Sequence, residues 1–196
     1  MTAVRISVGG EVIAKEAGIS VGLRKASSSD VHGEPLMSTN TTAASAEQRL
    51  KDLGINLPHP PTPLGAYVEA VQAGNLLFLS GTLPVEGGVP KFLGRIGGEL
   101  SVEDGRRATH VAALNALAIA KEHLGSLDRV TRVVRLGVSL VTTSEFREHP
   151  KVADAASELL VSVFGADKMS TRLVFGMASL PVGMCVLLEI ILEIRD

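Results

Sequence analysis

The chain has 196 residues, 45% hydrophobic and 20% charged, which predicts one globular domain with some additional tail. Its net charge is −2 and only 3% of its residues are aromatic, so we expect no phosphate-binding or base-stacking surface for nucleic acid. No apolar run reaches the roughly 18 residues of a membrane span, and the start lacks the apolar stretch of a secretory signal. The single Cys185 excludes an internal disulfide and suits a reducing compartment. These features predict a cytoplasmic protein without a membrane partner.

Residues 1–44 differ in composition from the rest of the chain. The stretches 26–30 and 38–45 are small and polar, and bury too little apolar surface to offset an ordering cost of about 1–2 kcal/mol per residue. Two interpretations stand: a disordered extension, or a non-native one in which Met37 is the natural start. Residues 45–196 are expected to form a single domain.

Helix-capping residues, glycines and prolines predict where the elements of that domain begin and end. Ser45 and Ser101 each begin a segment with capping-box spacing, and Gly54 and Gly125 are suited to end the corresponding helices. Between these helices, four prolines at positions 58, 60, 61 and 63 force an extended connector. The pattern predicts helix 45–54, strands 67–72, 76–80 and 91–96, helix 101–125, strand 130–141, helix 150–164, and strands 171–178 and 184–194.

This order, with strands outnumbering helices and only two helical crossovers, predicts an α+β fold in which a mixed sheet carries both helices on one face. In the last strand every even-numbered position from Met184 to Ile194 is apolar, so that side should meet the helices. Its odd-numbered positions include Glu189 and Glu193 beside apolar residues. Strand 171–178 repeats the alternation, with Leu173, Phe175 and Met177 on the apolar side and Arg172, Val174 and Gly176 on the mixed side.

A mixed second face on so apolar a chain favours coverage by another subunit. We therefore expect an oligomer.

Several short segments, taken together, resemble a known family. These are Tyr67, the segment 79–84 (Leu-Ser-Gly-Thr-Leu-Pro), Thr171-Arg172, Leu180-Pro181 and the strand around Glu189. Their order and spacing resemble the Rid (YjgF/YER057c/UK114) family of imine and enamine deaminases, also labelled endoribonuclease L-PSP, over about 140 residues. The sequence from Leu53 to Ile194 is similar to a divergent bacterial subgroup. The resemblance implies a chorismate-mutase-like fold and a homotrimer whose sheets form a central barrel, with a ligand cleft at each subunit interface.

The resemblance also implies roles for individual residues. Arg172 corresponds to the arginine that grips the carboxylate of a 2-imino acid, a bidentate task that suits a planar guanidinium. An ion pair of Arg172 with Glu189 or Glu193 at an interface is the alternative.

Tyr67 matches a tyrosine whose hydroxyl faces the ligand; the alternative is an ordinary half-buried strand tyrosine. Ser80 and Gly81 match a Ser-Gly pair whose backbone hydrogen-bonds ligand, with a simple strand-end turn as the alternative. Asp154 falls near a ligand-contacting helix asparagine, and a solvated helix charge is the alternative.

Two positions depart from the family pattern. Leu187 stands where typical members hold a water with a glutamate, and a leucine cannot polarise water. Val174 stands where they have a cysteine, and Cys185 is expected to be a buried, inert strand residue. Glu189, about 7 Å farther along the Leu187 face, is the candidate displaced base.

Three functions are compatible with these residues. The first is hydrolytic deamination of small 2-imino or 2-enamino acids to 2-oxo acids, with Arg172, Tyr67 and Glu189 as catalytic residues and Ser80, Gly81 and Asp154 binding substrate. The second is non-catalytic binding of a small carboxylate, which Leu187 favours; the third and least supported is an endoribonuclease. The glycines between Gly87 and Gly98 match no nucleotide-binding loop, and the five histidines have no metal-ligand spacing, so no cofactor or metal is expected.

Overall fold

The computed structural model describes residues 44–196, and the expected extension at residues 1–44 lies almost wholly outside that range. Helix α1 (Ala46–Asp52) begins where expected, with the Ser45 hydroxyl accepting a hydrogen bond from the Gln48 amide. Helix α2 (Val102–Leu124) has a full capping box between Ser101 and Asp104 and ends at Gly125 in the left-handed region. Both predicted capping signals are thus confirmed.

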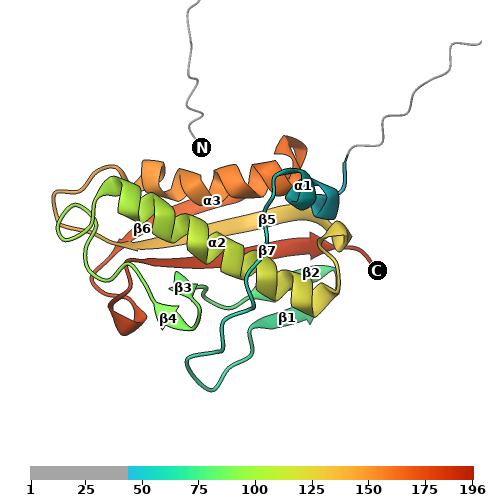
Figure 1. The fold of residues 1–196 in the computed structure, drawn as a ribbon, viewed down its shortest axis with the longest axis horizontal. Helices are drawn as coiled ribbons and strands as arrows, with labels where there is room; N and C mark the ends of the chain where they lie inside the picture. The colour runs from blue at the N-terminus through green and yellow to red at the C-terminus, as the bar shows by residue number, and fades with distance from the viewer. Residues whose placement is uncertain (1–43) are drawn as a thin grey trace, which may run out of the picture. The chain divides into compact units, whose positions relative to one another are not determined.

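A five-stranded mixed sheet forms the body of the fold, in the order β1-β2-β7-β5-β6 (Figure 1). Only the β5–β6 pair is parallel, because α3 crosses between these two strands; the other pairs are antiparallel. The elements of the sheet and its crossover are β1 (Ala70–Ala73), β2 (Leu76–Leu79), β5 (Val130–Val141), α3 (His149–Phe164), β6 (Thr171–Met177) and β7 (Val186–Ile194).

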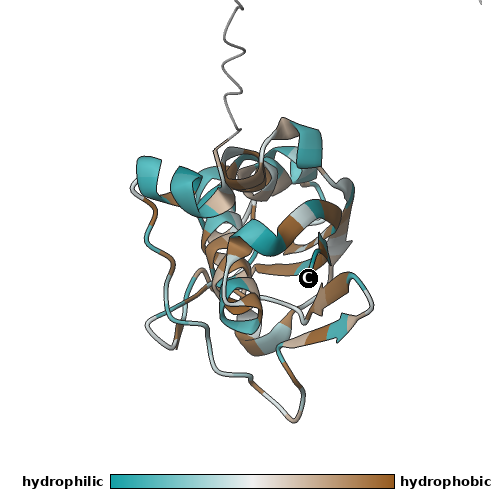
Figure 2. Ribbon diagram, turned by 90° about the vertical axis from the view of Figure 1, so that its right-hand side faces the viewer, coloured by the Kyte–Doolittle hydropathy of each residue, from teal (hydrophilic) through white to brown (hydrophobic). Residues whose placement is uncertain are grey.

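Helices α2 and α3 lie on one face of the sheet, as predicted, and the core fills the space between the two layers (Figures 1 and 2). Every even-numbered residue of β7 is buried on that face. The alanines of α2 allow it to approach the sheet closely, and Ala108, Ala112 and Ala116 are all fully buried. Short 3-10 turns η1 (Leu127–Arg129), η2 (Ala166–Lys168) and η3 (Pro181–Gly183) precede β5, β6 and β7.

One predicted strand is wrong. Residues 91–96 form no strand; a separate hairpin of β3 (Val85–Glu86) and β4 (Val89–Pro90) precedes them. Phe92 and Gly94 adopt positive φ values of 56° and 114°, which break an extended course. The segment is held instead by isolated bridges, such as Leu93 with Met184.

The predicted facing of β6 is also wrong. Leu173, Phe175 and Met177 are exposed on the face without helices, whereas Arg172 and Val174 point to the α3 side. The register decides this, because Arg172 pairs with Leu136 and Leu136 with Ile190, both buried under the helices.

The face of the sheet opposite the helices is largely apolar. Val71 and Phe78 are cross-strand partners on it, and Phe78 in turn pairs with Ile191. Together with the three apolar residues of β6, this makes a broad surface of half-exposed hydrophobic side chains, of the kind that marks an interaction face. The expectation of a second subunit is therefore supported by a more apolar exposed face than the sequence alone predicted.

Candidate functional site

Arg172 lies on β6, an edge strand, and is held by two side chains of α3. Its Nη1 donates to Asp154 Oδ1 at 2.7 Å and to Ser157 Oγ at 3.0 Å. Asp154 and Ser157 are three residues apart and therefore share one side of the helix. The Nε and Nη2 of Arg172 have no partner among the described residues. With its side chain 27% exposed, Arg172 keeps half of its donor fork available at the edge of the sheet.

Among the described residues Arg172 forms an ion pair with Asp154, and none with Glu189 or Glu193. Glu189 lies on the opposite face of the sheet, since its cross-strand partner Gly137 aligns with Leu173 rather than with Arg172. It faces Arg135, whose Nη2 lies 3.6 Å from Glu189 Oε2. Arg135 also has a buried Nε with no partner among residues 44–196.

Ser80 and Gly81 lie toward the other side of the sheet, directly after β2, which is second from that edge because β1 lies outside it. An irregularity in the pairing of β2 with β7 falls at these two residues. Phe78 pairs with Ile191 of β7, and Thr82 pairs with Leu188. Four residue steps lead from Phe78 to Thr82 but only three from Ile191 to Leu188, so the first segment contains one extra residue. Such a bulge bends the strand and re-aims its groups. Ser80 is bonded to the end of the connector just before β1: its amide donates to Glu69 O and its hydroxyl to Val68 O. The Gly81 amide makes no hydrogen bond with the described residues.

Gly81 is required by a close neighbour rather than by its φ. A Cβ built there would stand 3.0 Å from Leu187 Cδ1 and 3.1 Å from Leu187 Cδ2. Leu187 therefore fills the space over the bulge where the resemblance implies a water-holding glutamate. Leu187, which replaces the acid, is packed against Gly81, so this part of the region is apolar.

Tyr67 joins the same region from the connector before β1. It precedes the strand rather than belonging to it, because β1 begins only at Ala70. Its hydroxyl accepts a hydrogen bond from the Leu64 amide at 3.2 Å, and its side chain is 47% exposed. A shallow cavity of about 440 Å³ brings together Tyr67, Ser80, Gly81 and Leu187, with Leu64, Gly65, Leu83 and Pro181 completing its wall.

Five of the predicted residues thus form two groups on opposite sides of the sheet, and the sixth, Glu189, lies between them on the central strand β7. One group, which we call the β2 edge, is Tyr67, Ser80 and Gly81; the other, at β6, is Arg172 and Asp154. Three strand spacings of about 4.8 Å separate β2 from β6, or roughly 14 Å. One chain does not assemble these residues into a single cleft.

The sequence did not single out two residues at the Arg172 edge. Ser157 accepts from the guanidinium, and one helical turn from Asp154 is the spacing that could have indicated it. His149 begins α3; its ring packs edge-on to Phe146 at 5.1 Å, and Nε2 lies 3.4 Å from Thr142 Oγ1. The same Nε2 would stand 3.1 Å from a Cβ at Gly176. His149 and Arg172 therefore lie along one side of β6, and no short-range motif connects them.

Cys185 is fully buried, as predicted, and burial raises the pKa of its thiol to about 12. A neutral thiol at that position is a poor nucleophile. Among residues 44–196, no group of three His, Cys, Asp or Glu side chains is placed to hold a metal ion. In the same part of the chain, no helix has the length and apolar character needed to cross a membrane.

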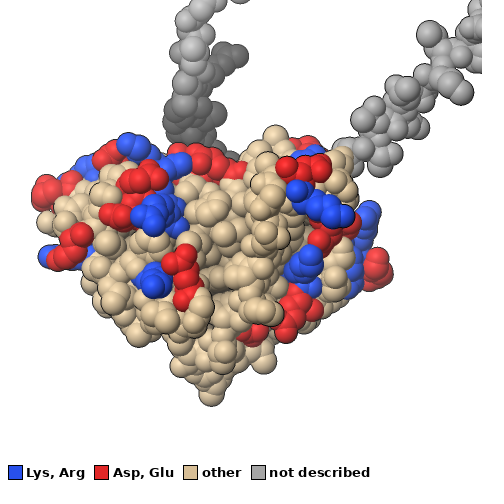
Figure 3. All heavy atoms as spheres, in the orientation of Figure 1, with Lys and Arg blue, Asp and Glu red and all other residues tan. Residues whose placement is uncertain are grey.

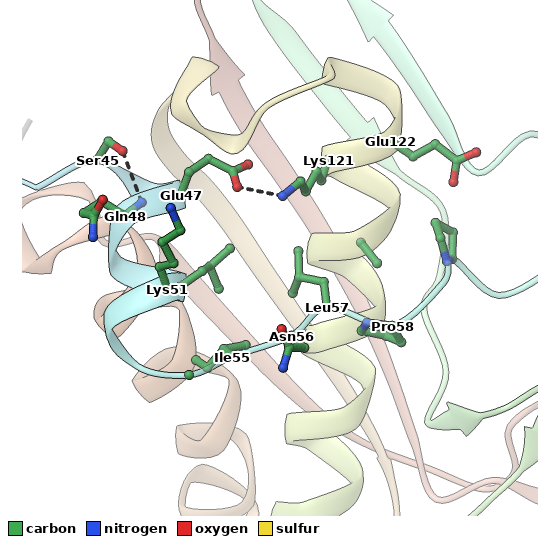
Figure 4. A pocket seen from close by; sticks show the side chains of 14 residues that line it. Ser45, Glu47, Gln48, Lys51, Ile55, Asn56, Leu57, Pro58, Lys121 and Glu122 are labelled. Carbon is green, nitrogen blue, oxygen red and sulfur yellow. Dashed lines mark hydrogen bonds and ion pairs between the residues drawn. The ribbon is translucent and has the colours of Figure 1, made fainter.

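A larger cavity lies elsewhere, between α1, the proline-rich connector and α2, with a volume of about 680 Å³ (Figure 4). Two of the charges in its wall are paired with each other: Lys121 Nζ lies 2.6 Å from Glu47 Oε2. The other oxygen of Glu47 accepts from the Leu127 amide, while the Glu47 amide donates to Asp128. These bonds attach α1 to α2 and η1, which gives the charged residues in this wall a structural role. None of the predicted site residues lines it.

Comparison with known proteins decides the family. Residues 47–194 match the family model described as "YjgF/chorismate mutase-like, putative endoribonuclease". The chain belongs to this family. The match covers almost all of the residues that the structure describes, and it confirms the chorismate-mutase-like α+β fold.

Three relatives illustrate the breadth of the family. Protein TCP17 of Trypanosoma cruzi is 36% identical over 148 residues, which are 75% of this chain and 92% of that protein. Atu1372 of Agrobacterium tumefaciens, a solved structure of unknown function, is 37% identical over 76% of this chain and 92% of that one, with a TM-score of 0.71. A "putative endoribonuclease" of Shewanella oneidensis is 31% identical over 77% of this chain and 100% of that one, with a TM-score of 0.74.

Proposed function

We propose that the chain works as a homotrimer in which the Arg172 edge of one subunit meets the Tyr67 edge of the next. The support comes from two features of the single chain. The half-exposed apolar face of the sheet needs a cover, and a barrel of three sheets would bury it. The residues that the family uses together belong to strands roughly 14 Å apart in one chain, and a head-to-tail contact would close that gap at each of three interfaces.

In this cleft the protein hydrolyses small 2-imino or 2-enamino acids to 2-oxo acids and ammonia. The observation that carries the proposal is the Arg172 guanidinium, which is positioned by α3 and keeps Nε and Nη2 available for a substrate carboxylate. The Gly81 amide and the Tyr67 hydroxyl, at the adjoining edge, orient the imine. A 2-enamino acid enters the same course after tautomerising to the imine.

The chemical step consumes one water. The water oxygen bonds to C2 while the C=N π pair moves to nitrogen, which takes up the proton that the water gives up. The resulting carbinolamine then loses ammonia: its C–N bond breaks, the hydroxyl proton passes to the leaving nitrogen, and the C=O bond forms. Imines hydrolyse in water without a catalyst, so positioning of the substrate supplies much of the acceleration.

Glu189 is the base in this scheme. It is the carboxylate on the Leu187 side of β7, about 7 Å farther along the strand, and it is half exposed beside Arg135. From there it would contact the water that attacks C2 less directly than a glutamate at position 187 would, so we expect a weaker contribution from the base than in members with the usual glutamate.

A second function is favoured by Leu187 itself. With an apolar side chain packed on Gly81, the cleft could retain carboxylate binding without turnover. An endoribonuclease, the activity in the family description, has less physical support. Figure 3 shows acidic and basic side chains interspersed over the face that carries the helices, rather than a basic surface that would track a phosphate backbone.

The deciding experiment generates 2-iminobutyrate in situ and compares its decay with wild type, with Arg172→Ala and without protein. We expect wild type to accelerate release of 2-oxobutyrate and Arg172→Ala to lose the effect by roughly a hundredfold, because a charged partner of the substrate is removed. Arg107→Ala, which removes an exposed arginine of α2, is the matched control and should behave as wild type.

The other outcomes are equally informative. If neither protein accelerates decay but butyrate raises the melting temperature of wild type alone, the protein is a carboxylate binder and the deaminase proposal is wrong. If butyrate has no effect either, Arg172 is not a ligand-binding residue.

A further inference from the structure

Asp154 occupies an unusual place for a residue beside a carboxylate-binding arginine. Its Oδ1 lies 2.7 Å from Arg172 Nη1, so the guanidinium already has an anionic partner before any ligand binds. The Asp154 side chain is 46% exposed at the same edge as the two available donors of Arg172. A ligand that reaches Nε and Nη2 must therefore approach a carboxylate as well as a cation.

The pair has consequences for the charge of a ligand. A ligand with only a carboxylate is attracted by Arg172 but repelled by the like charge of Asp154. The two effects act together because the guanidinium and the Asp154 carboxylate are in contact with each other. A ligand that carries a positive nitrogen next to its carboxylate meets a complementary charge at both positions. A 2-imino acid protonated on nitrogen is such a zwitterion, with the carboxylate and the iminium on adjacent carbon centres.

We propose that Asp154 is the specificity-determining residue of the cleft, binding the iminium N–H of a protonated 2-imino acid while Arg172 binds its carboxylate. This inference rests on the proposed function, since it names the ionisation state of the substrate at that same site. The selected form is also the reactive one, because an iminium carbon is more electrophilic than a neutral imine carbon.

Ser157 makes the exchange of partners possible. Its hydroxyl accepts from the same Nη1 that contacts Asp154. When Asp154 turns to the ligand nitrogen, Ser157 keeps the guanidinium oriented. The same charges favour product release: the 2-oxo acid has lost the cationic nitrogen, and its carboxylate remains beside Asp154 without compensation.

The test compares ligands that differ in charge. Calorimetric titration of wild type with 2-aminobutyrate, a stable zwitterion, and with butyrate or 2-oxobutyrate should show the zwitterion binding roughly tenfold more tightly, as expected for one charged hydrogen bond. In Asp154→Asn the preference should reverse, with the two monoanions bound more tightly than by wild type and 2-aminobutyrate more weakly. An unchanged preference in Asp154→Asn overturns the inference.

Two further variants keep the result interpretable. Glu158→Gln removes another acid of α3 that pairs with an arginine at 2.8 Å, Arg106, and should leave the preference as in wild type. Ser157→Ala should weaken all three ligands equally, because it loosens Arg172 and leaves the charge of Asp154 in place.

The outcome is separable from that of the proposed function. If the charge preference depends on Asp154 but no 2-iminobutyrate is consumed, the deaminase proposal fails and the assignment of Asp154 stands. If turnover depends on Arg172 but the preference does not respond to Asp154, only the present inference fails.

Discussion

The two edges of the sheet carry the candidate residues in different ways. At the β6 edge the arrangement is made by charged side chains, with α3 supplying Asp154 and Ser157 to fix Arg172. At the β2 edge it is made by backbone and shape: the bulge contains Gly81, whose amide makes no hydrogen bond with the described residues, and the Leu187 side chain packs against Gly81. One edge is suited to bind charge and the other to orient a small uncharged group.

Neither edge is a binding site by itself. The β6 edge offers a partly exposed charge pair, whereas the β2 edge offers a cavity of about 440 Å³ with few polar groups. Ligand pockets usually combine apolar walls with a small number of well-placed polar groups. The two edges have these properties separately, which is why we place the site between subunits.

Mixing two inactive variants is the clearest test of whether the site is divided between two subunits. Arg172→Ala and Tyr67→Ala should each be inactive as homotrimers. Refolded together in equal amounts, they should recover about a quarter of the wild-type rate, because a quarter of random interfaces join an intact Arg172 edge to an intact Tyr67 edge. The rate of 2-oxobutyrate release from the mixture measures this.

A mixture of two variants from one edge is the control. Tyr67→Ala and Gly81→Val both alter the β2 edge, so no interface in their mixture has an intact copy of it, and the mixture should remain inactive. Recovery in this control would mean that Tyr67 and Gly81 act from different subunits and do not share one edge. No recovery in the first mixture, despite a trimeric mass, would place the site within one chain.

Local signals in the sequence predicted the helices and the central strands well. Ser45 and Ser101 mark helix starts through their own side-chain hydrogen bonds, which depend on residues three positions away. The even-numbered positions of β7 are buried because α2 and α3 cover a sheet face that this central strand shares with its neighbours. In both cases the pattern and its cause lie within the same chain.

The orientation of β6 could not be predicted in this way. Alternation of Leu173, Phe175 and Met177 indicates that one side of the strand avoids water, but it does not say what covers that side. In a central strand the cover is the chain's own helix layer. At this edge α3 lies over Arg172 instead, and the apolar side is left exposed in the single chain. The separation of the candidate residues over two edges has the same cause, because family resemblance aligns residues without saying which copy provides them.

Restoring an acid over Gly81 should have the next largest effect. Leu187→Glu puts a carboxylate where the Leu187 side chain now packs on Gly81, and a positioned base contributes at least about a hundredfold where its geometry is ideal. We expect a gain of roughly tenfold in kcat with little change in KM, since the new side chain is not held by evolved neighbours. Rates of 2-oxobutyrate release against substrate concentration separate the two constants.

Glu189→Gln serves as the companion variant. It should lower kcat in the wild-type background and have little effect in Leu187→Glu, because the nearer carboxylate then holds the water. If Glu189→Gln is without effect in both backgrounds, Glu189 is only the ion-pair partner of Arg135.

The smallest expected difference concerns two glycines, one at each edge. Gly81→Ala would bring a methyl group 3.0 Å from Leu187 Cδ1, and Gly176→Ala would bring one 3.1 Å from His149 Nε2. At Gly81 the neighbour is packed in the wall of the cavity, so we expect a severalfold rise in KM that Leu187→Ala partly reverses by making room. At Gly176 the neighbour is a half-buried ring at the start of α3, which can turn outward, and KM should change by less than about twofold. A larger effect at Gly176 than at Gly81 would mean that His149 contributes to binding at the Arg172 edge, and that this edge is the more tightly specified of the two.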